Sequence, residues 1–124
     1  MSDRLPRAFE IAAAPVAGAP GVAIRGEVDI AHGPELSEAL DAAIRASDGA
    51  FVVDLTDVEF LDSTGLNALM RARALLGQTE RDLAVVCPPG TVRRLFEVAG
   101  VEDLLVLFGS REEAAAALVS PDAG

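Results

Sequence analysis

A polar tetrapeptide, Asp62-Ser63-Thr64-Gly65, separates two apolar segments and carries the residue types best suited to chemistry in this chain. Asp, Ser and Thr side chains accept hydrogen bonds from the free N–H groups at a helix start, and glycine permits close approach of another segment. Either Asp62 or Ser63 is therefore expected to cap a helix. A phosphate is tolerated there, because the unpaired N–H groups and the helix dipole both favour negative charge. The tetrapeptide thus indicates either a purely structural cap or a phosphoacceptor at Ser63, with Thr64 as the alternative acceptor.

Two enzymatic interpretations of the same residues are not supported by the pattern. His32 is the only histidine and could form a hydrolytic triad with Ser63 and an aspartate, but the Gly-x-Ser-x-Gly elbow is missing. Asp54 follows an apolar run, like the phosphoacceptor of receiver domains, but that chemistry needs a lysine and all 10 basic residues are arginines. We expect Asp54 and Asp57 to close a turn by hydrogen bonds to the backbone. The chain is therefore predicted not to be an enzyme.

The sequence also indicates no metal or cofactor. Carboxylates and one histidine show no ligand spacing, and Cys87 is the only cysteine, which is expected to be a small buried apolar residue. No glycine-rich phosphate loop supports nucleotide binding. Arg93 and Arg94 are expected to form a solvated rim or to contact an acidic partner.

Composition limits the class of partner. The 124 residues have the length of one domain, 51% of them are hydrophobic, and the net charge is −10. Such a charge argues against direct nucleic-acid binding and favours a partner that offers basic residues. The N-terminal segment lacks the apolar run of a signal peptide, and no run is long enough to cross a bilayer. A cytoplasmic protein without direct membrane contact is predicted.

The elements that must position these residues follow from periodicity and turn residues. Alternating Phe9, Ile11 and Ala13, a turn at 18–21 and renewed alternation to Val28 predict an opening hairpin. The loop 26–35 then leads into a helix. That helix carries Leu36, Leu40, Ala43 and Ile44 on one face and should end near Asp48-Gly49.

The rest of the chain alternates between predicted strands and helices. Strands are expected at 51–53, 83–87 and 104–108, and helices at 63–77, at 92–99 before Gly100, and from Ser110 to about Val119. The strands are too apolar to have a wet face. We predict one α/β domain over 9–119, with a mostly parallel mixed sheet, an N-terminal hairpin strand and helices packed against it. The termini, 1–8 and 120–124, are expected to be flexible.

Three segments together resemble a known family. Gly26-Glu27-Val28-Asp29, Val53-Asp54-Leu55 followed by Phe60-Leu61-Asp62-Ser63-Thr64-Gly65-Leu66, and Val92-Arg93-Arg94-Leu95-Phe96-Glu97-Val98-Ala99-Gly100-Val101 are similar to signatures of STAS-domain anti-sigma-factor antagonists. The resemblance runs from about Phe9 to Val119. The domain over 9–119 is therefore expected to be a STAS domain.

The resemblance implies a regulatory switch. In that family the unphosphorylated antagonist binds an anti-sigma factor that is also a serine kinase, so that the sigma factor is released and transcription starts. The kinase then phosphorylates the serine matched here by Ser63, the antagonist dissociates, and a phosphatase restores it. Asp29 and Asp62 match the acidic residues that flank this serine.

The expected contact surface combines the loop around Asp29 with the start of the Ser63 helix. Its predicted partner-binding residues are Asp29, His32, Asp62, Ser63, Thr64, Gly65 and Asn67. Ser63→Asp should stay folded yet lose the partner, whereas Ser63→Ala should bind constitutively, at a cost of about 0.5 to 2 kcal/mol if Ser63 is the cap. The alternative is a STAS subunit of a lipid-transport or stress-signalling complex.

His32 stands where relatives often have a threonine cap, and residues 78–81 replace a common Gly-Gly turn. A histidine near the contact surface suggests partner binding that depends on pH between 6 and 8.

Overall fold

The computed structural model describes residues 9–119 and contains five strands and four α-helices. The strands are β1 (Glu10–Ala13), β2 (Gly21–Val28), β3 (Phe51–Leu61), β4 (Leu83–Val86) and β5 (Val106–Phe108). The helices are the 3-10 turn η1 (Ile30–His32), α1 (Gly33–Arg45), α2 (Ser63–Gly77), α3 (Thr91–Ala99) and α4 (Arg111–Leu118). The segments predicted to be flexible, 1–8 and 120–124, lie outside the described residues.

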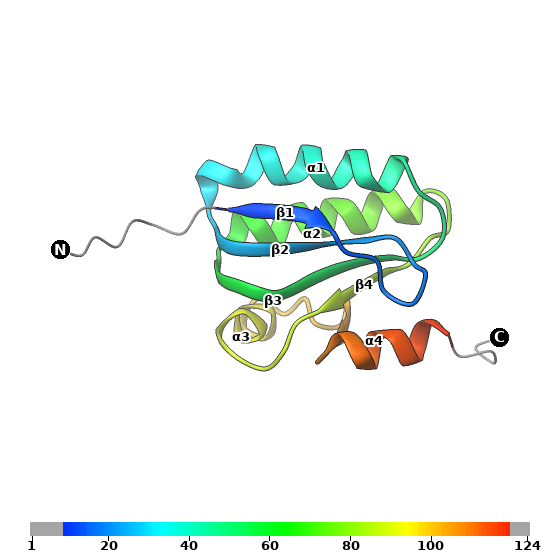
Figure 1. The fold of residues 1–124 in the computed structure, drawn as a ribbon. Helices are drawn as coiled ribbons and strands as arrows, with labels where there is room; N and C mark the ends of the chain where they lie inside the picture. Colours follow the sequence, from blue (N-terminus) through cyan, green and yellow to red (C-terminus); the bar gives the residue numbers. More distant parts are fainter. Residues whose placement is uncertain (1–8, 120–124) are drawn as a thin grey trace.

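The strands form one mixed sheet in the order β1-β2-β3-β4-β5. β1 pairs antiparallel with β2, and the other neighbours pair in parallel. Figure 1 shows α1 and α2 on one side of the sheet and α3 and α4 on the other. The predicted α/β fold, with its hairpin strand and mostly parallel sheet, is confirmed.

The central strands are apolar because helices cover both of their faces. Successive side chains of a strand point to opposite faces, so Val53 and Val85 enter the core under α1 and α2, whereas Val52 and Val86 meet Ala114 of α4. The sheet edges differ from the prediction that no strand has a wet face. β1 is largely exposed, and Val106 of β5 is also exposed, because the helices cover the faces of these edge strands less completely than those of the central strands.

The strand that precedes Ser63 is much longer than the predicted segment 51–53. β3 continues to Leu61, and its register with β2 shifts between Ala23 and Arg25, so Asp54 lies inside the strand and not at its end. The Asp54 Oδ1 atom accepts hydrogen bonds from the backbone N–H (2.9 Å) and hydroxyl (2.6 Å) of Thr56. The predicted side-chain to backbone bond exists for Asp54, but it stabilises an irregularity in a strand that continues.

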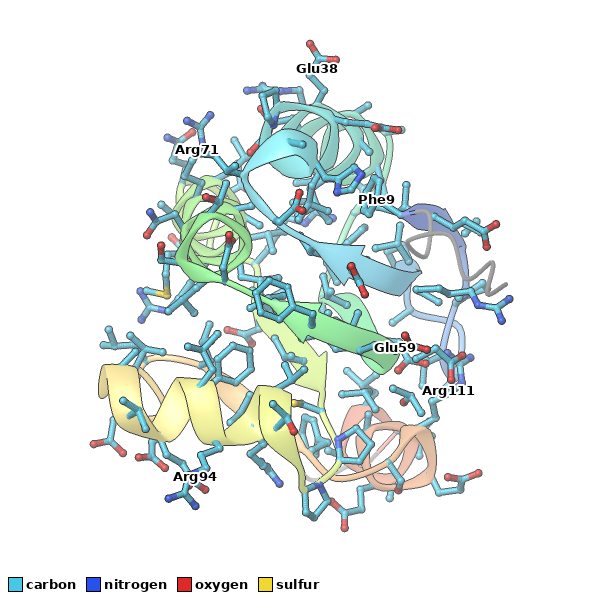
Figure 2. All side chains as sticks on the ribbon, turned by 90° about the vertical axis from the view of Figure 1, so that its left-hand side faces the viewer. Phe9, Glu38, Glu59, Arg71, Arg94 and Arg111 are labelled. Atoms are coloured by element: carbon cyan, nitrogen blue, oxygen red, sulfur yellow. The ribbon has the colours of Figure 1, made fainter. Side chains whose placement is uncertain are left out.

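Helix α4 is attached to the sheet through an ion pair. Arg111 Nη1 lies 3.1 Å from Oδ2 of Asp54, which is buried, and Arg111 Nη2 donates to the Pro15 carbonyl at 2.9 Å. Arg111 therefore links the start of α4 to β3 and to the β1–β2 connection. Figure 2 labels Arg111 at the side of the sheet where α4 begins.

The helix ends follow the expected turn chemistry, with adjustments at α1 and α4. Gly100 stops α3 in the left-handed conformation, at φ 73°. Ser110 caps α4 by accepting from the Glu113 N–H, but the Glu113 carboxylate accepts from Gly109 and not from the cap residue itself. Helix α1 ends at Arg45, before the predicted Asp48-Gly49, and β5 begins at Val106 and not at 104. No helix within residues 9–119 combines the length and apolar character required to span a bilayer.

Candidate partner-binding and phosphorylation site

The carboxyl ends of β2 and β3 bring the predicted site residues to one end of the sheet. Val28 and Leu61 are register partners, and the Asp62 N–H donates to the Val28 carbonyl at 3.2 Å. Each strand then leads directly into a helix that packs on the same face, so the N-termini of α1 and α2 start beside each other. Figure 2 views this end of the molecule, with α1 and α2 seen close to end-on.

Asp62, and not Ser63, caps α2. The Asp62 Oδ1 atom accepts from the N–H groups of Thr64 (2.9 Å) and Gly65 (3.4 Å), and its backbone is extended, as is typical of a cap. Ser63 is the first helical residue, its side chain is exposed, and its hydroxyl makes no hydrogen bond within residues 9–119. Of the two caps that the sequence leaves open, the structure selects Asp62. The Ser63 hydroxyl is thereby left available.

Thr64 and Gly65 turn inward and hold the helix starts together. Thr64 is half-buried, and a Cβ atom added to Gly33 would overlap its Cγ2 methyl group. Gly65 is buried, and a Cβ added there would lie 2.8 Å from Leu61 Cγ and 3.0 Å from Val28 Cγ1. Gly65 therefore serves the packing of α2 on the sheet, because a side chain would force this packing apart.

Asp29 and His32 form the neighbouring turn. Asp29 caps η1 by accepting from the Ala31 N–H at 3.0 Å. The buried His32 Nδ1 atom lies 3.1 Å from Asp29 Oδ1 but forms no hydrogen bond within the described residues. The His32 ring stacks on Phe9 with centroids 5.3 Å apart. His32 occupies the cap position of α1 without capping it through its side chain. The ring is therefore fixed against Phe9, whose position next to the start of α1 is visible in Figure 2.

The structure brings the seven predicted residues together with unequal exposure. Ser63 and Asn67 are exposed, four residues apart on one side of α2. Asp29, His32, Asp62 and Thr64 are half-buried, and Gly65 is buried. A partner can reach all of them except Gly65, whose role is to allow close packing.

Sequence reasoning did not single out four residues that lie next to the candidate site, namely Phe9, Ile30, Gly33 and Phe60. Gly33 contacts Thr64, and Phe9 stacks on His32. The partners in each pair are too far apart in the sequence for a local pattern to predict the contact. Ile30 and Phe60 are exposed although both are large and apolar. The detectable signal was an apolar residue next to each of the polar segments that carry Asp29 and Asp62.

Cys87 lies outside this site, at the end of β4. It is buried, and burial raises the pKa of its thiol, while the Arg93 guanidinium opposes the rise to a smaller extent. Burial matches the predicted apolar role. Arg93 is half-buried and Arg94 is exposed on the outer side of α3, where Figure 2 labels it. Within residues 9–119 no three His, Cys, Asp or Glu side chains are grouped so that they could hold a metal ion.

Comparisons with known proteins agree with the fold. Residues 12–107 match the family profile described as "Mlab, STAS domain". The anti-sigma-B factor antagonist of Staphylococcus aureus strain NCTC 8325 is 32% identical over 84 residues, which are 68% of this chain and 78% of the relative. The corresponding antagonist of Listeria monocytogenes is 32% identical over 83 residues, 66% of this chain and 72% of the relative.

Solved structures show the same architecture. The crystal structure of an anti-sigma factor antagonist from Mycobacterium paratuberculosis has a TM-score of 0.84 and 28% identity, covering 94% of this chain and 98% of that chain. Unphosphorylated SpoIIAA has a TM-score of 0.71 at 19% identity, covering 90% and 96% of the two chains, which supports the fold alone. The matched profile, the similarity to the antagonists and the shared fold show that this chain belongs to the STAS-domain family of anti-sigma factor antagonists.

Proposed function

We propose that this chain, when unphosphorylated, binds an anti-sigma factor that is also a serine kinase and so releases the sigma factor. Phosphorylation of Ser63 by that kinase ends the binding, and a phosphatase restores it. The observation that carries the proposal is the Ser63 hydroxyl, which is exposed at the start of α2 while Asp62 performs the capping. The protein acts in the cytoplasm by binding, without catalysis of its own.

The charges around Ser63 explain why a phosphate would switch binding off. A phosphate adds about −1.5 to −2 charge next to the Asp62 carboxylate and near Asp29, in a chain whose net charge is already −10. A close protein contact there would then suffer repulsion and desolvation. The fold would persist, because a helix N-terminus favours negative charge and the Asp62 cap is unchanged. Phosphorylation is thus expected to act on the interface and not on stability.

The packing favours Ser63 over Thr64 as the acceptor. The Thr64 methyl group lies against Gly33, so Thr64 is half-buried between the two helix starts. A kinase must reach the acceptor hydroxyl, and Ser63 is exposed whereas Thr64 is half-buried.

The test is affinity capture from an extract of the source organism, with ADP present and mass spectrometry of the retained proteins. Wild type is compared with Ser63→Asp and with the matched control Thr91→Asp, which places the same charge at the exposed first residue of α3. We expect wild type and Thr91→Asp to retain an anti-sigma factor with a kinase fold that Ser63→Asp loses. Incubation of wild type with the retained anti-sigma factor and ATP should then add one phosphate at Ser63. The same incubation should add none to Ser63→Ala.

One result would overturn the proposed function, and a second would overturn only the assignment of the acceptor. If wild type and Ser63→Asp retain the same transporter or scaffold subunits, the alternative function as a subunit of a lipid-transport or stress-signalling complex replaces it. If the retained kinase phosphorylates Thr64 in wild type and in Ser63→Ala, the antagonist function stands but the assignment of the acceptor is wrong.

A further inference from the structure

Two large apolar side chains are exposed at the end of the sheet that carries Ser63. Ile30 is 76% exposed and Phe60 is 46% exposed. We propose that Ile30 and Phe60 are the apolar anchors of the docking surface, and that their occupant is an anti-sigma factor offering apolar pockets within a basic rim. This inference rests on the proposed function and adds to it the residues that provide affinity.

The sheet register places Phe60 beside the site. Phe60 pairs with Glu27 and Leu61 pairs with Val28, in adjacent parallel strands. Because side chains alternate along a strand, Leu61 and Val28 enter the core under α1 and α2. Phe60 and Glu27 consequently lie on the opposite face, and each comes two residues before an acidic residue of the site, Asp62 and Asp29 respectively. Phe60 thus contributes to the surface at the strand end and not to the core.

The turn after β2 presents Ile30 in a comparable way. Ile30 is the first residue of η1, a turn with no buried residue, and it directly follows the capping residue Asp29. The hydrogen bond from the Ala31 N–H to Asp29 fixes the backbone on both sides of Ile30. The packing of η1 instead involves His32, which stacks on Phe9. Ile30 is therefore held at the surface by an ordered turn.

Large exposed apolar side chains next to a polar site are candidates for contact with a partner protein. Burial of an apolar side chain in a complex removes its surface from water, and a few such residues near the centre of an interface usually carry most of its affinity. Ile30 and Phe60 lie at the carboxyl ends of adjacent strands, on the two chain segments that carry Asp29 and Ser63. A partner that contacts Ser63 is therefore placed to cover both.

The charges next to the anchors define the partner's chemistry. Asp29 precedes Ile30, Glu27 is the register partner of Phe60, and Asp62 follows Phe60 by two residues. Opposite charges across an interface steer association and exclude wrong partners, so the rim of the partner should be rich in arginine or lysine. A phosphate on Ser63 would add to this acidic cluster next to the anchors, which matches the proposed loss of binding.

The experiment measures the affinity of the purified, full-length protein for the anti-sigma factor identified by the capture above. The two proteins are titrated by isothermal titration calorimetry in the presence of ADP. The variants are Ile30→Ala and Phe60→Ala. The controls are Val106→Ala and Leu104→Ala, which truncate residues of comparable exposure, 55% and 45%, at the β5 edge of the sheet. Thermal melting establishes that all variants are folded, and each titration is repeated at 50 and 300 mM NaCl.

We expect Ile30→Ala and Phe60→Ala each to weaken binding about tenfold or more, and the controls to change it less than twofold. The factor by which each anchor variant weakens binding should be the same at both salt concentrations, because the lost contacts are apolar. The affinity of wild type and of every variant should fall as the salt concentration rises, because the rim is charged. If Ser63→Asp abolishes binding but both anchor variants bind like wild type, the docking proposal is wrong and the proposed function stands. If wild type binds no anti-sigma factor, the proposed function fails and the docking proposal fails with it.

Self-association is the competing use of the same side chains. Sedimentation of the free protein tests it directly. A wild-type dimer that Ile30→Ala and Phe60→Ala convert to monomers would overturn the proposal, because a second copy would then be the occupant. We expect monomers in all cases.

Discussion

Thr64 packs its methyl group directly on Gly33, so that the first turn of α2 touches the first residue of α1. Gly33 has ordinary helical backbone angles, φ −55° and ψ −51°, so only contact with Thr64 and not backbone strain excludes a side chain there. The two helices that carry the site are thereby fixed to each other at the point where a partner is expected to bind.

This contact predicts opposite effects of one substitution in two backgrounds. Gly33→Ala should destabilise wild type by about 1 to 3 kcal/mol, because the added methyl group overlaps Thr64. In a Thr64→Ala background, Gly33→Ala should instead be neutral or stabilising by up to about 1 kcal/mol, because alanine restricts the unfolded chain. Urea denaturation of the four proteins measures the coupling. Equal effects of Gly33→Ala in both backgrounds would contradict the contact.

The assignment of the cap predicts different costs for neighbouring residues. Asp62→Ala should lower the free energy of unfolding by about 0.5 to 2 kcal/mol, because the N–H groups of Thr64 and Gly65 lose their acceptor. Ser63→Ala removes no hydrogen bond within the described residues and should change it by less than about 0.5 kcal/mol. Denaturant titration distinguishes the two. A larger loss for Ser63→Ala than for Asp62→Ala would show that the cap is misassigned.

The buried carboxylate of Asp54 predicts a dependence on Arg111. Arg111→Met keeps most of the side-chain volume but leaves Asp54 without its guanidinium, so a loss of about 1 to 3 kcal/mol is expected. Amide exchange should quicken in α4, which Arg111 attaches to β3. In a matched test, Asp54→Asn in the Arg111→Met background should recover part of the loss, because a neutral amide is less costly to bury than an unpaired carboxylate. If the losses in free energy of unfolding from Arg111→Met and Asp54→Asn simply add, the two residues of the ion pair are not energetically coupled.

Cys87 predicts how stability changes in alkaline solution. Burial raises the pKa of its thiol in the folded state, so the unfolded chain releases the thiol proton at a lower pH. The free energy of unfolding therefore has its full value below the pKa of the thiol in the unfolded chain. It falls as pH rises from there toward the raised pKa of the thiol in the folded state, by at most about 1.4 kcal/mol per pH unit. The chain has no lysine and no tyrosine, so no other side chain titrates there.

The measurement for Cys87 is urea denaturation from pH 8.5 to 10 in wild type and Cys87→Ala. The variant should be less stable overall, because it leaves a small cavity, but its stability should vary less with pH than that of wild type. An equal dependence on pH in both proteins would rule out the thiol as its source.

The position of His32 at the expected contact surface predicts an effect of pH on partner binding. A proton on His32 adds positive charge to a site that is expected to meet a basic partner, so affinity should be lower at pH 6 than at pH 8. Titrations of the captured anti-sigma factor should show a smaller change for His32→Gln. A flat affinity of wild type between pH 6 and 8 would remove this hypothesis.

Much of the fold could be predicted from local patterns in the sequence. The end of α2 at Gly77, the stop of α3 at Gly100 and the cap of α4 at Ser110 follow from residues within a few positions of each end. The alternation of strands and helices also predicted the mostly parallel sheet, because parallel neighbours need a crossover between them. The acidic and hydroxyl residues around Ser63 marked the site itself.

The boundaries that failed depend on pairing between distant segments. β3 reaches Leu61 because β2 pairs with it through Val28, which outweighs the polar residues at 54–57 within the strand. Similarly, Asp54 was expected to close a turn, whereas its second oxygen pairs with Arg111 from the far end of the chain. Such partners leave no trace in the local pattern.

The sequence by itself determined the fold class, the ends of α2 and α3 and the polar tetrapeptide at Ser63, because these follow from propensities and spacing within a few residues. Only the tertiary structure decided that Asp62 is the cap, that Thr64 is held against Gly33 while Ser63 is exposed, and that Ile30 and Phe60 remain uncovered. The physical reason is that exposure and contact depend on how α1, α2 and the ends of β2 and β3 pack together, and this packing joins residues far apart in the chain.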